Sequence, residues 1–149
     1  MLTLGAEHLR SIEIAAQAAF PEEACGLLVG HTENVDDIIL SAVIGSDNVA
    51  PDARERRFEV DPGVRIKLEK DLRGGTERLV GHYHSHPDGP ARPSAHDLEQ
   101  AFEPDLIWLV VGVADGHANE VRAWKLAPGG AAFEPVALTV AALRKAQDT

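Results

Sequence analysis

The chain has 149 residues, 44% of them apolar and 26% charged, which is the ordinary balance of a soluble globular protein. This length favours one domain, residues 1–149, with enough chain to form a hydrophobic core. The 24 acidic residues outnumber the 14 basic ones and give a net charge of −10. Because an acidic protein repels phosphate backbones, we expect no nucleic acid partner.

The sequence also restricts the compartment and the kind of metal site. It has no run of about 18 apolar residues, so we expect no membrane span. Residues 1–10 lack the basic stretch and apolar block of a signal peptide. Cys25 is the single cysteine, which excludes an internal disulfide and the cysteine-rich zinc sites. We therefore expect a cytoplasmic protein, in which any metal site is built from histidine, aspartate and glutamate.

The first half of the chain is predicted to contain helices and short strands. Apolar residues at helical spacing predict a helix over 5–20. A second helix is predicted over 64–72, because Asp61 and Pro62 form a typical helix start. Strands are predicted over 26–30, 35–44 and 58–60, with a polar loop over 46–57.

The second half is predicted to be mainly strand. The pattern indicates a strand over 78–84, a helix over 94–102, strands over 106–113, 119–126 and 133–140, and a helical or frayed tail over 141–147. The run 106–113 is the most apolar and is expected at the centre of a sheet. Helices and strands interleave without regular alternation, so we expect an α/β fold with an α+β-like mixed sheet flanked by helices.

The stretch 81–99 carries the most chemical information. His84 and His86 lie two apart on a predicted strand, so their side chains share one face, about 6.6 Å apart along the strand. Two imidazoles so placed can bind one zinc ion. The alternative is a pair of surface histidines. His82 shares the same face and could be a third ligand, but we favour a neighbouring role because it lies further back in the strand.

Ser94 and Asp97 allow two interpretations. The pattern S-x-x-D after a proline is a capping box, in which both residues only begin a helix. Alternatively, the loop 87–93 folds back over the two histidines, and Asp97 in the first helical turn supplies an oxygen ligand. Ser94 would then be free to donate a hydrogen bond to a polarised carbonyl oxygen.

Glu23 follows the first predicted helix, and its neighbour Glu22 competes for the same role. A glutamate in such a place is usually a solvated loop residue. A zinc hydrolase, however, needs a carboxylate base that takes a proton from water and passes it to the leaving amine. Cys25, at the start of an apolar strand, is expected to be a small buried hydrophobe. Trp108 is likewise expected in the core.

The segment His84-Ser85-His86-Pro87, six further residues, and then Ser94-x-x-Asp97, with a glutamate upstream, resembles the JAMM motif of the MPN-plus metallopeptidases. The resemblance covers most of the chain and is closest to compact stand-alone bacterial members. It implies that His84, His86 and Asp97 bind zinc, one ion per chain with a bound water. It also implies that Glu23 is the general acid/base, two residues before Cys25, and that Ser94 stabilises the tetrahedral intermediate.

The resemblance further implies an MPN fold, a curled mixed sheet laid out like the cytidine deaminases. The deaminase signature itself, H-x-E with P-C-x-x-C, is absent. The implied activity is hydrolysis of a peptide or isopeptide bond after the C-terminal Gly-Gly of a ubiquitin-like or sulfur-carrier protein. The alternatives are a non-catalytic MPN scaffold that binds ubiquitin-like proteins, and a zinc hydrolase of small amides or dipeptides.

The expected partner is a ubiquitin-like or sulfur-carrier protein with a Gly-Gly tail, and the chain itself is expected to be a monomer or homodimer. The loop 46–57 is a candidate wall of the channel for that tail. Arg54, Arg56 and Arg57 form a local basic cluster in or beside this loop. The cluster is either a solvated loop segment or a docking patch for an acidic partner.

Overall fold

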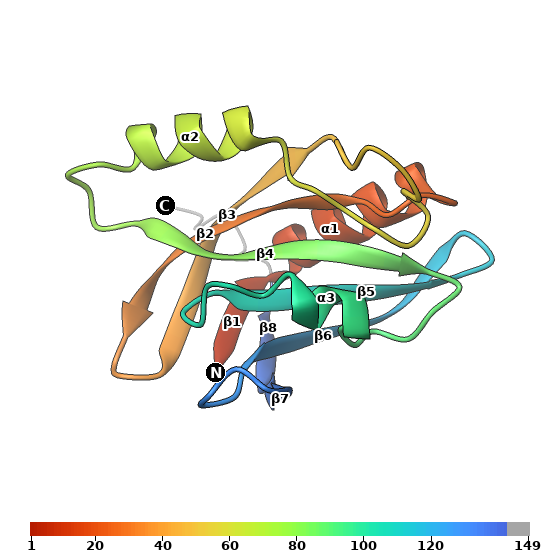
Figure 1. The fold of residues 1–149 in the computed structure, drawn as a ribbon. Helices are drawn as coiled ribbons and strands as arrows, with labels where there is room; N and C mark the ends of the chain where they lie inside the picture. Colours follow the sequence, from red (N-terminus) through yellow and green to blue (C-terminus); the bar gives the residue numbers. More distant parts are fainter. Residues whose placement is uncertain (143–149) are drawn as a thin grey trace, which may run out of the picture.

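The computed structural model describes residues 1–142, which form eight strands and three helices (Figure 1). The first half contains β1 (Leu2–Gly5), α1 (Ala6–Ala19), β2 (Cys25–Glu33), β3 (Asp37–Ser46) and α2 (Pro62–Asp71). The second half contains β4 (Arg78–Pro87), α3 (Ala95–Glu99), β5 (Ile107–Ala114), β6 (His117–Leu126), β7 (Phe133–Val136) and β8 (Leu138–Ala141).

All eight strands belong to one mixed sheet in the order β7-β6-β5-β4-β2-β3-β1-β8. Three neighbouring pairs are parallel, namely β4 with β5, β1 with β3, and β1 with β8. The other four pairs are antiparallel. The expected mixed sheet is therefore confirmed, and β4 lies inside it between β2 and β5.

The sheet curls until its two edges nearly meet. β7 and β8 occupy opposite ends of the strand order, yet only Ala137 separates them in the chain. Ala137 accepts a hydrogen bond from the backbone N–H of Leu2, at 2.8 Å. Figure 1 accordingly shows β7 and β8 close together in the lower part of the molecule. The predicted single strand over 133–140 was wrong, because the chain changes edges at Ala137.

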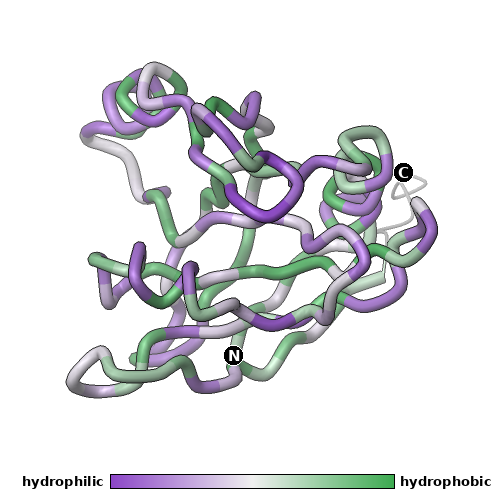
Figure 2. Tube along the Cα trace, turned by 45° about the vertical axis from the view of Figure 1, so that its right-hand side comes forward, coloured by the Kyte–Doolittle hydropathy of each residue, from purple (hydrophilic) through white to green (hydrophobic). Residues whose placement is uncertain are grey.

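The hydrophobic core lies between the curled sheet and α1. α1 contributes Ile12 and Ala16, both buried, while Leu28 and Leu109 are completely buried in the sheet. Burying one such leucine or isoleucine side chain stabilises the fold by about 1.5–3 kcal/mol. Hydrophobic stretches run along the strands that cross the middle of the molecule (Figure 2). The central position predicted for 106–113 is confirmed, since Ile107 to Val113 are all buried.

The two other helices are attached less deeply. α2 begins at the predicted place, where Asp61 caps it by accepting from the N–H of Gly63, but it has no buried residue. α3 is shorter than the predicted helix over 94–102, because it starts after Ser94 and ends at Glu99. Within residues 1–142, no helix has the length and apolar character needed to cross a membrane.

Several boundaries differ from the sequence-based expectation. β1 was missed, because four residues are too few to show periodicity, and α1 begins at Ala6. The strand expected over 58–60 is reduced to an isolated bridge between Asn48 and Val60. The tail predicted over 141–147 begins with the last residue of β8, and residues 143–147 lie outside the described part.

Candidate metal centre

Strand β4 brings the two histidines to the middle of the sheet. It extends to Pro87 because β5 pairs with it along its whole second half, so His84 and His86 lie within the strand. Side chains at alternate positions share a face, and the two Nε2 atoms are only 3.0 Å apart. His84 is completely buried, whereas His86 keeps slight exposure.

Asp97 completes a close triangle with this pair. Its Oδ2 atom lies 3.1 Å from Nε2 of His84 and 3.1 Å from Nε2 of His86. The capping box is present as well, since Ser94 Oγ accepts from the N–H of Asp97 and the N–H of Ser94 donates to Oδ2. The capping box therefore coexists with a position of Asp97 beside the two histidines. The cap uses the Ser94 hydroxyl only as an acceptor, which leaves its proton for another partner.

The loop 87–93 folds back as expected and fixes the tautomer of His86. Nδ1 of His86 lies 3.0 Å from the carbonyl oxygen of Pro90. A carbonyl only accepts, so Nδ1 carries the proton, and the Nε2 lone pair of the neutral ring points at His84 and Asp97. A lone pair facing a carboxylate is repulsive unless a proton or a metal cation lies between them. Two imidazole nitrogens and one carboxylate oxygen are a donor set suited to zinc, so the residues fit a metal ion.

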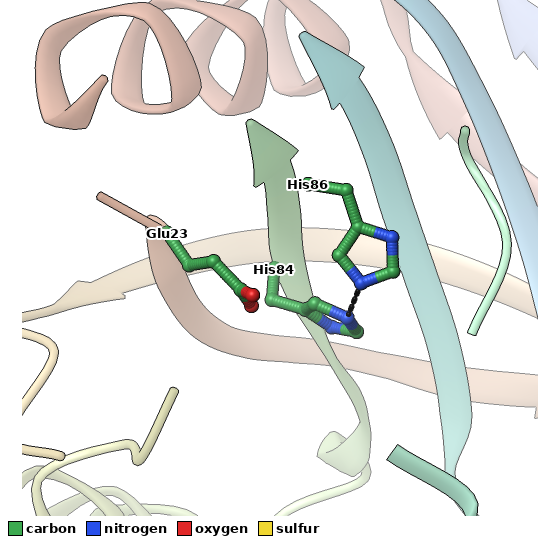
Figure 3. Close-up of side chains that lie close together, drawn as sticks. All are labelled: Glu23, His84 and His86. Carbon is green, nitrogen blue, oxygen red and sulfur yellow. Dashed lines mark hydrogen bonds between the residues drawn. The ribbon is translucent and has the colours of Figure 1, made fainter. Parts of the chain in front are cut away.

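Glu23 faces the same centre from the turn before β2. Its side chain is 3% exposed, and Oε1 is buried with no hydrogen-bond partner among residues 1–142. One potential ligand atom from each of Glu23, His84 and His86 forms a group within 4.8 Å. Figure 3 shows the Glu23 carboxylate pointing toward the His84 ring. The competing Glu22 is exposed, so the structure brings Glu23 to the histidines.

The carboxyl groups at this centre have opposite pKa shifts. Burial, opposed by the charge of His86 and assisted by that of Asp97, raises the pKa of Glu23 to about 8. Burial would also raise the pKa of Asp97, but its hydrogen bonds with His84 and His86 outweigh that effect and hold the pKa below its usual range. Asp97 is therefore the anionic member of the site, and Glu23 is a carboxyl ready to hold a proton.

Ser85, between the two histidines, links β4 to the backbone beside Glu23. Its Oγ accepts from the N–H of Ala24 at 2.8 Å, and its own N–H donates to the Ala24 carbonyl at 3.0 Å. Sequence reasoning missed this role. The sequence feature that could have indicated it is the position of Ser85 between His84 and His86. A residue between two strand residues that share one face points to the opposite face of the sheet.

Aromatic rings enclose the buried side of the histidines. The Phe58 ring lies flat on His84, with centroids 4.2 Å apart and 13° between the planes. Trp108 meets His82 edge-on at 4.3 Å and is buried, as expected. His82 lies outside the triangle, 6.4 Å from the His84 ring, and burial lowers its pKa to about 3. Cys25 is buried, which confirms its expected role as a small hydrophobe.

A groove of about 580 Å³ is lined by Asp97 and by aromatic side chains. Phe58, His82 and Trp108 line it, and it extends to Phe102, which is 78% exposed. Arg65 of α2 makes two hydrogen bonds to Glu103, at 2.6 and 2.8 Å, and both side chains also line the groove. An ion pair thus joins α2 to the segment after α3.

The basic cluster is partly neutralised by its own loop. Segment 52–59 contains three basic and three acidic side chains. Arg57 pairs with Asp52 at 3.5 Å, and Nε of Arg54 donates to the carbonyl of Ala50. This segment therefore has no net positive charge, which weakens the expectation of a docking patch for an acidic partner.

Residues 5–127 match the family model of the prokaryotic homologs of the JAB domain, called Prok-JAB. This chain belongs to the Prok-JAB family. The match includes β4, α3 and all the residues of the candidate metal centre. The family membership expected from the JAMM-like motif is thereby confirmed.

Two named relatives are similar over most of the Prok-JAB chain. The CysO-cysteine peptidase of Mycobacterium tuberculosis is 29% identical over 143 residues, which cover 91% of this chain and 90% of that protein. A probable TtuB-protein conjugate cleaving protease of Thermus thermophilus is 35% identical over 120 residues, covering 80% of this chain and 70% of that protein.

Solved structures share the fold. A protein from Desulfitobacterium hafniense, solved in solution, superimposes with a TM-score of 0.81 at 29% identity and covers 95% of this chain and 94% of its own. A JAB1/MPN domain protein from Archaeoglobus fulgidus gives a TM-score of 0.56 at 22% identity, over 93% and 97% of the two chains. The fold is therefore the expected MPN fold.

Proposed function

We propose that this Prok-JAB protein is a zinc-dependent peptidase. Its substrate would be the peptide or isopeptide bond that follows the C-terminal Gly-Gly of a ubiquitin-like or sulfur-carrier protein. The observation that carries the proposal is the buried Glu23 carboxylate beside the triangle of His84, His86 and Asp97. The names of the two relatives support the substrate class, because one acts on CysO-cysteine and the other on TtuB-protein conjugates.

In this proposal His84, His86 and Asp97 hold the zinc ion. When bound, zinc supplies Lewis acidity, which polarises a carbonyl group and lowers the pKa of water to about 7. The hydrogen bond from His86 Nδ1 to Pro90 and the two bonds between Ser94 and Asp97 orient these ligands. Such outer contacts keep each donor atom pointing at one place.

Glu23 is the proton carrier of the proposed reaction. In its ionised form the buried carboxylate takes the proton of the attacking water, and its raised pKa helps it to hold that proton until the leaving amine accepts it. Ser94 is exposed just before α3, and its hydroxyl group acts only as an acceptor in the helix cap. In the proposed reaction this hydroxyl donates a hydrogen bond to the oxyanion that develops on the scissile carbonyl. Glu23 thus provides general acid–base catalysis, and Ser94 provides electrostatic stabilisation of the oxyanion.

The groove beside Asp97 is the proposed binding place for the substrate tail. Its walls, which include Phe58 and Trp108, offer apolar surface for an extended peptide. Two glycines have no side chains, so a Gly-Gly end could approach the metal centre through a narrow passage. The body of the carrier protein would remain outside.

The donor set disfavours a non-catalytic scaffold, because His84, His86, Asp97 and Glu23 are all present and brought together. The dipeptidase alternative is tested by comparing kcat/KM for a short Gly-Gly-X peptide and for a whole carrier protein. We expect the carrier to be the better substrate. Equal values for both substrates would favour the small-amide hydrolase.

The proposal is tested with a sulfur-carrier protein whose Gly-Gly end is followed by a short peptide. Incubation with the zinc-loaded chain should yield a product that ends in Gly-Gly, identified by its mass. The Glu23→Gln variant should keep its zinc and leave the substrate intact. Cleavage at another bond, or cleavage by Glu23→Gln at the wild-type rate, would contradict the proposal.

A further inference from the structure

The carboxamide of Asn48, which follows β3, uses all of its hydrogen-bonding capacity. Nδ2 donates to the carbonyl oxygens of Glu23 at 3.1 Å and of Arg57 at 2.9 Å. Oδ1 accepts from the N–H groups of Ala50 and Glu59, each at 3.1 Å. One side chain therefore ties the backbone of the proposed base to three residues of the loop 50–59, namely Ala50, Arg57 and Glu59.

Two of these three residues lie on either side of Phe58. Arg57 and Glu59 flank it in the chain, and its ring stacks on the imidazole of His84. A further backbone bond, from the N–H of Glu23 to the carbonyl of Arg54, attaches the same loop to Glu23. The loop thus contacts the proposed base on one side and a proposed zinc ligand on the other.

The side chain of Glu23 needs this support from the backbone. Its Oε1 has no hydrogen-bond partner within residues 1–142. With no such bond to locate that oxygen, the position of the carboxylate depends on where the backbone at Glu23 and Ala24 is held. Ser85 holds Ala24, and Asn48 holds the carbonyl of Glu23.

We propose that Asn48 is a positioning residue, which sets the distance between the Glu23 carboxylate and the His84–His86 pair by fixing the backbone of Glu23 to the loop that carries Phe58. The inference rests on the proposed function, because it assigns Asn48 to the same reaction. A misplacement of about 1 Å in a reacting group can lower a rate about 100-fold.

Two substitutions separate the halves of the carboxamide. Asn48→Asp keeps both acceptor positions, for Ala50 and Glu59, and loses both donors. Asn48→Ala loses all four bonds. The matched control is Asn119→Ala, which removes an exposed asparagine of β6. Each variant is loaded with zinc, and its zinc content, melting temperature, kcat and KM are measured. Amide hydrogen exchange is measured separately, to follow the protection of the backbone N–H groups.

In Asn48→Asp we expect the amides of Ala50 and Glu59 to stay protected and the zinc content to stay that of the wild type. The kcat should nevertheless fall about 100-fold with little change in KM, because the base is misplaced. In Asn48→Ala we expect a lower kcat as well, and here the amides of Ala50 and Glu59 should exchange faster than in the wild type. In a Glu23→Asp background the further loss from Asn48→Asp should be much smaller, because the two residues act on one step.

A purely structural role predicts other results. Asn48→Asp would then keep the wild-type kcat per folded, zinc-loaded molecule, or lose the same factor in both backgrounds, and either result would overturn the role of Asn48. These outcomes require an active wild type that Glu23→Gln inactivates. A wild-type chain without turnover would instead overturn the proposed function, and the positioning role with it.

Discussion

The ring of Phe58 lies flat against the imidazole of His84, with 4.2 Å between centroids and 13° between planes. His84 is completely buried, and its Nδ1 has no hydrogen-bond partner in the described part of the chain. Histidine ligands are commonly oriented through their second nitrogen. In His84 no such hydrogen bond is present in the described part of the chain, and the imidazole is instead held by stacking of its face against the ring of Phe58.

Phe58→Ala should therefore weaken zinc binding. Loss of a group that orients a ligand costs about 10–100-fold in metal affinity, and we expect a loss in this range. The control is Phe102→Ala, since Phe102 also lines the groove but is exposed. Competition with a chelator measures both affinities. The same affinity for Phe58→Ala and the wild type would show that stacking does not orient His84.

Glu23 should make the metal-free protein less stable as pH rises. Its pKa is raised by burial from 4.5 to about 8, so folding favours the neutral carboxyl. This contribution is fully present below about pH 4.5 and is lost as pH rises through about 8. The melting temperature of metal-free Glu23→Gln, relative to the wild type, should thus increase between these pH values. Other titrating groups are shared by both proteins, so a constant difference would contradict the shift.

Ser94 has two separable roles, a helix cap and a proposed oxyanion donor. Ser94→Ala loses both, with a stability cost of about 1 kcal/mol from the cap and a fall in kcat of about 10²–10³-fold. Ser94→Thr retains a hydroxyl and should largely restore both. Thermal unfolding and steady-state kinetics separate the two effects. If Ser94→Ala keeps the wild-type kcat, the hydroxyl acts only as a cap.

Gly81, three residues before His84 in β4, allows β4 and β5 to approach closely. A Cβ atom at this position would lie 2.3 Å from the backbone oxygen of Ile107. Gly81→Ala should therefore destabilise the fold by about 1–3 kcal/mol, as measured by denaturant unfolding. The control Gly75→Ala should have little effect, because its nearest neighbour would be 3.5 Å away. Equal stabilities would show that the two strands can separate at little cost.

The candidate metal centre was predictable because its signals are local. His84 and His86 share a strand face by spacing alone, and Ser94 with Asp97 marks a helix start. The contact between Asp97 and the histidines depended on the loop 87–93, whose direction no local pattern sets. The resemblance to the JAMM motif supplied that step and also the preference for Glu23 over Glu22.

The features that were missed depend on distant parts of the chain. β7 and β8 form one continuous pattern in the sequence, and only pairing with β6 and β1 divides them at Ala137. Pro135 was the available hint, because a proline in a sheet favours an edge strand. No local pattern assigned a role to Asn48, since a single asparagine in a polar loop does not show which backbone groups its side chain will meet.

The zinc content of the purified chain, after loading and removal of loosely held metal, tests the central claim most directly. The account predicts about one zinc per wild-type chain and none in Asp97→Ala, because that variant loses one of three ligands and leaves the histidines in place. Zinc bound equally by Asp97→Ala, or no zinc bound by the wild type, would contradict a metal centre made by His84, His86 and Asp97.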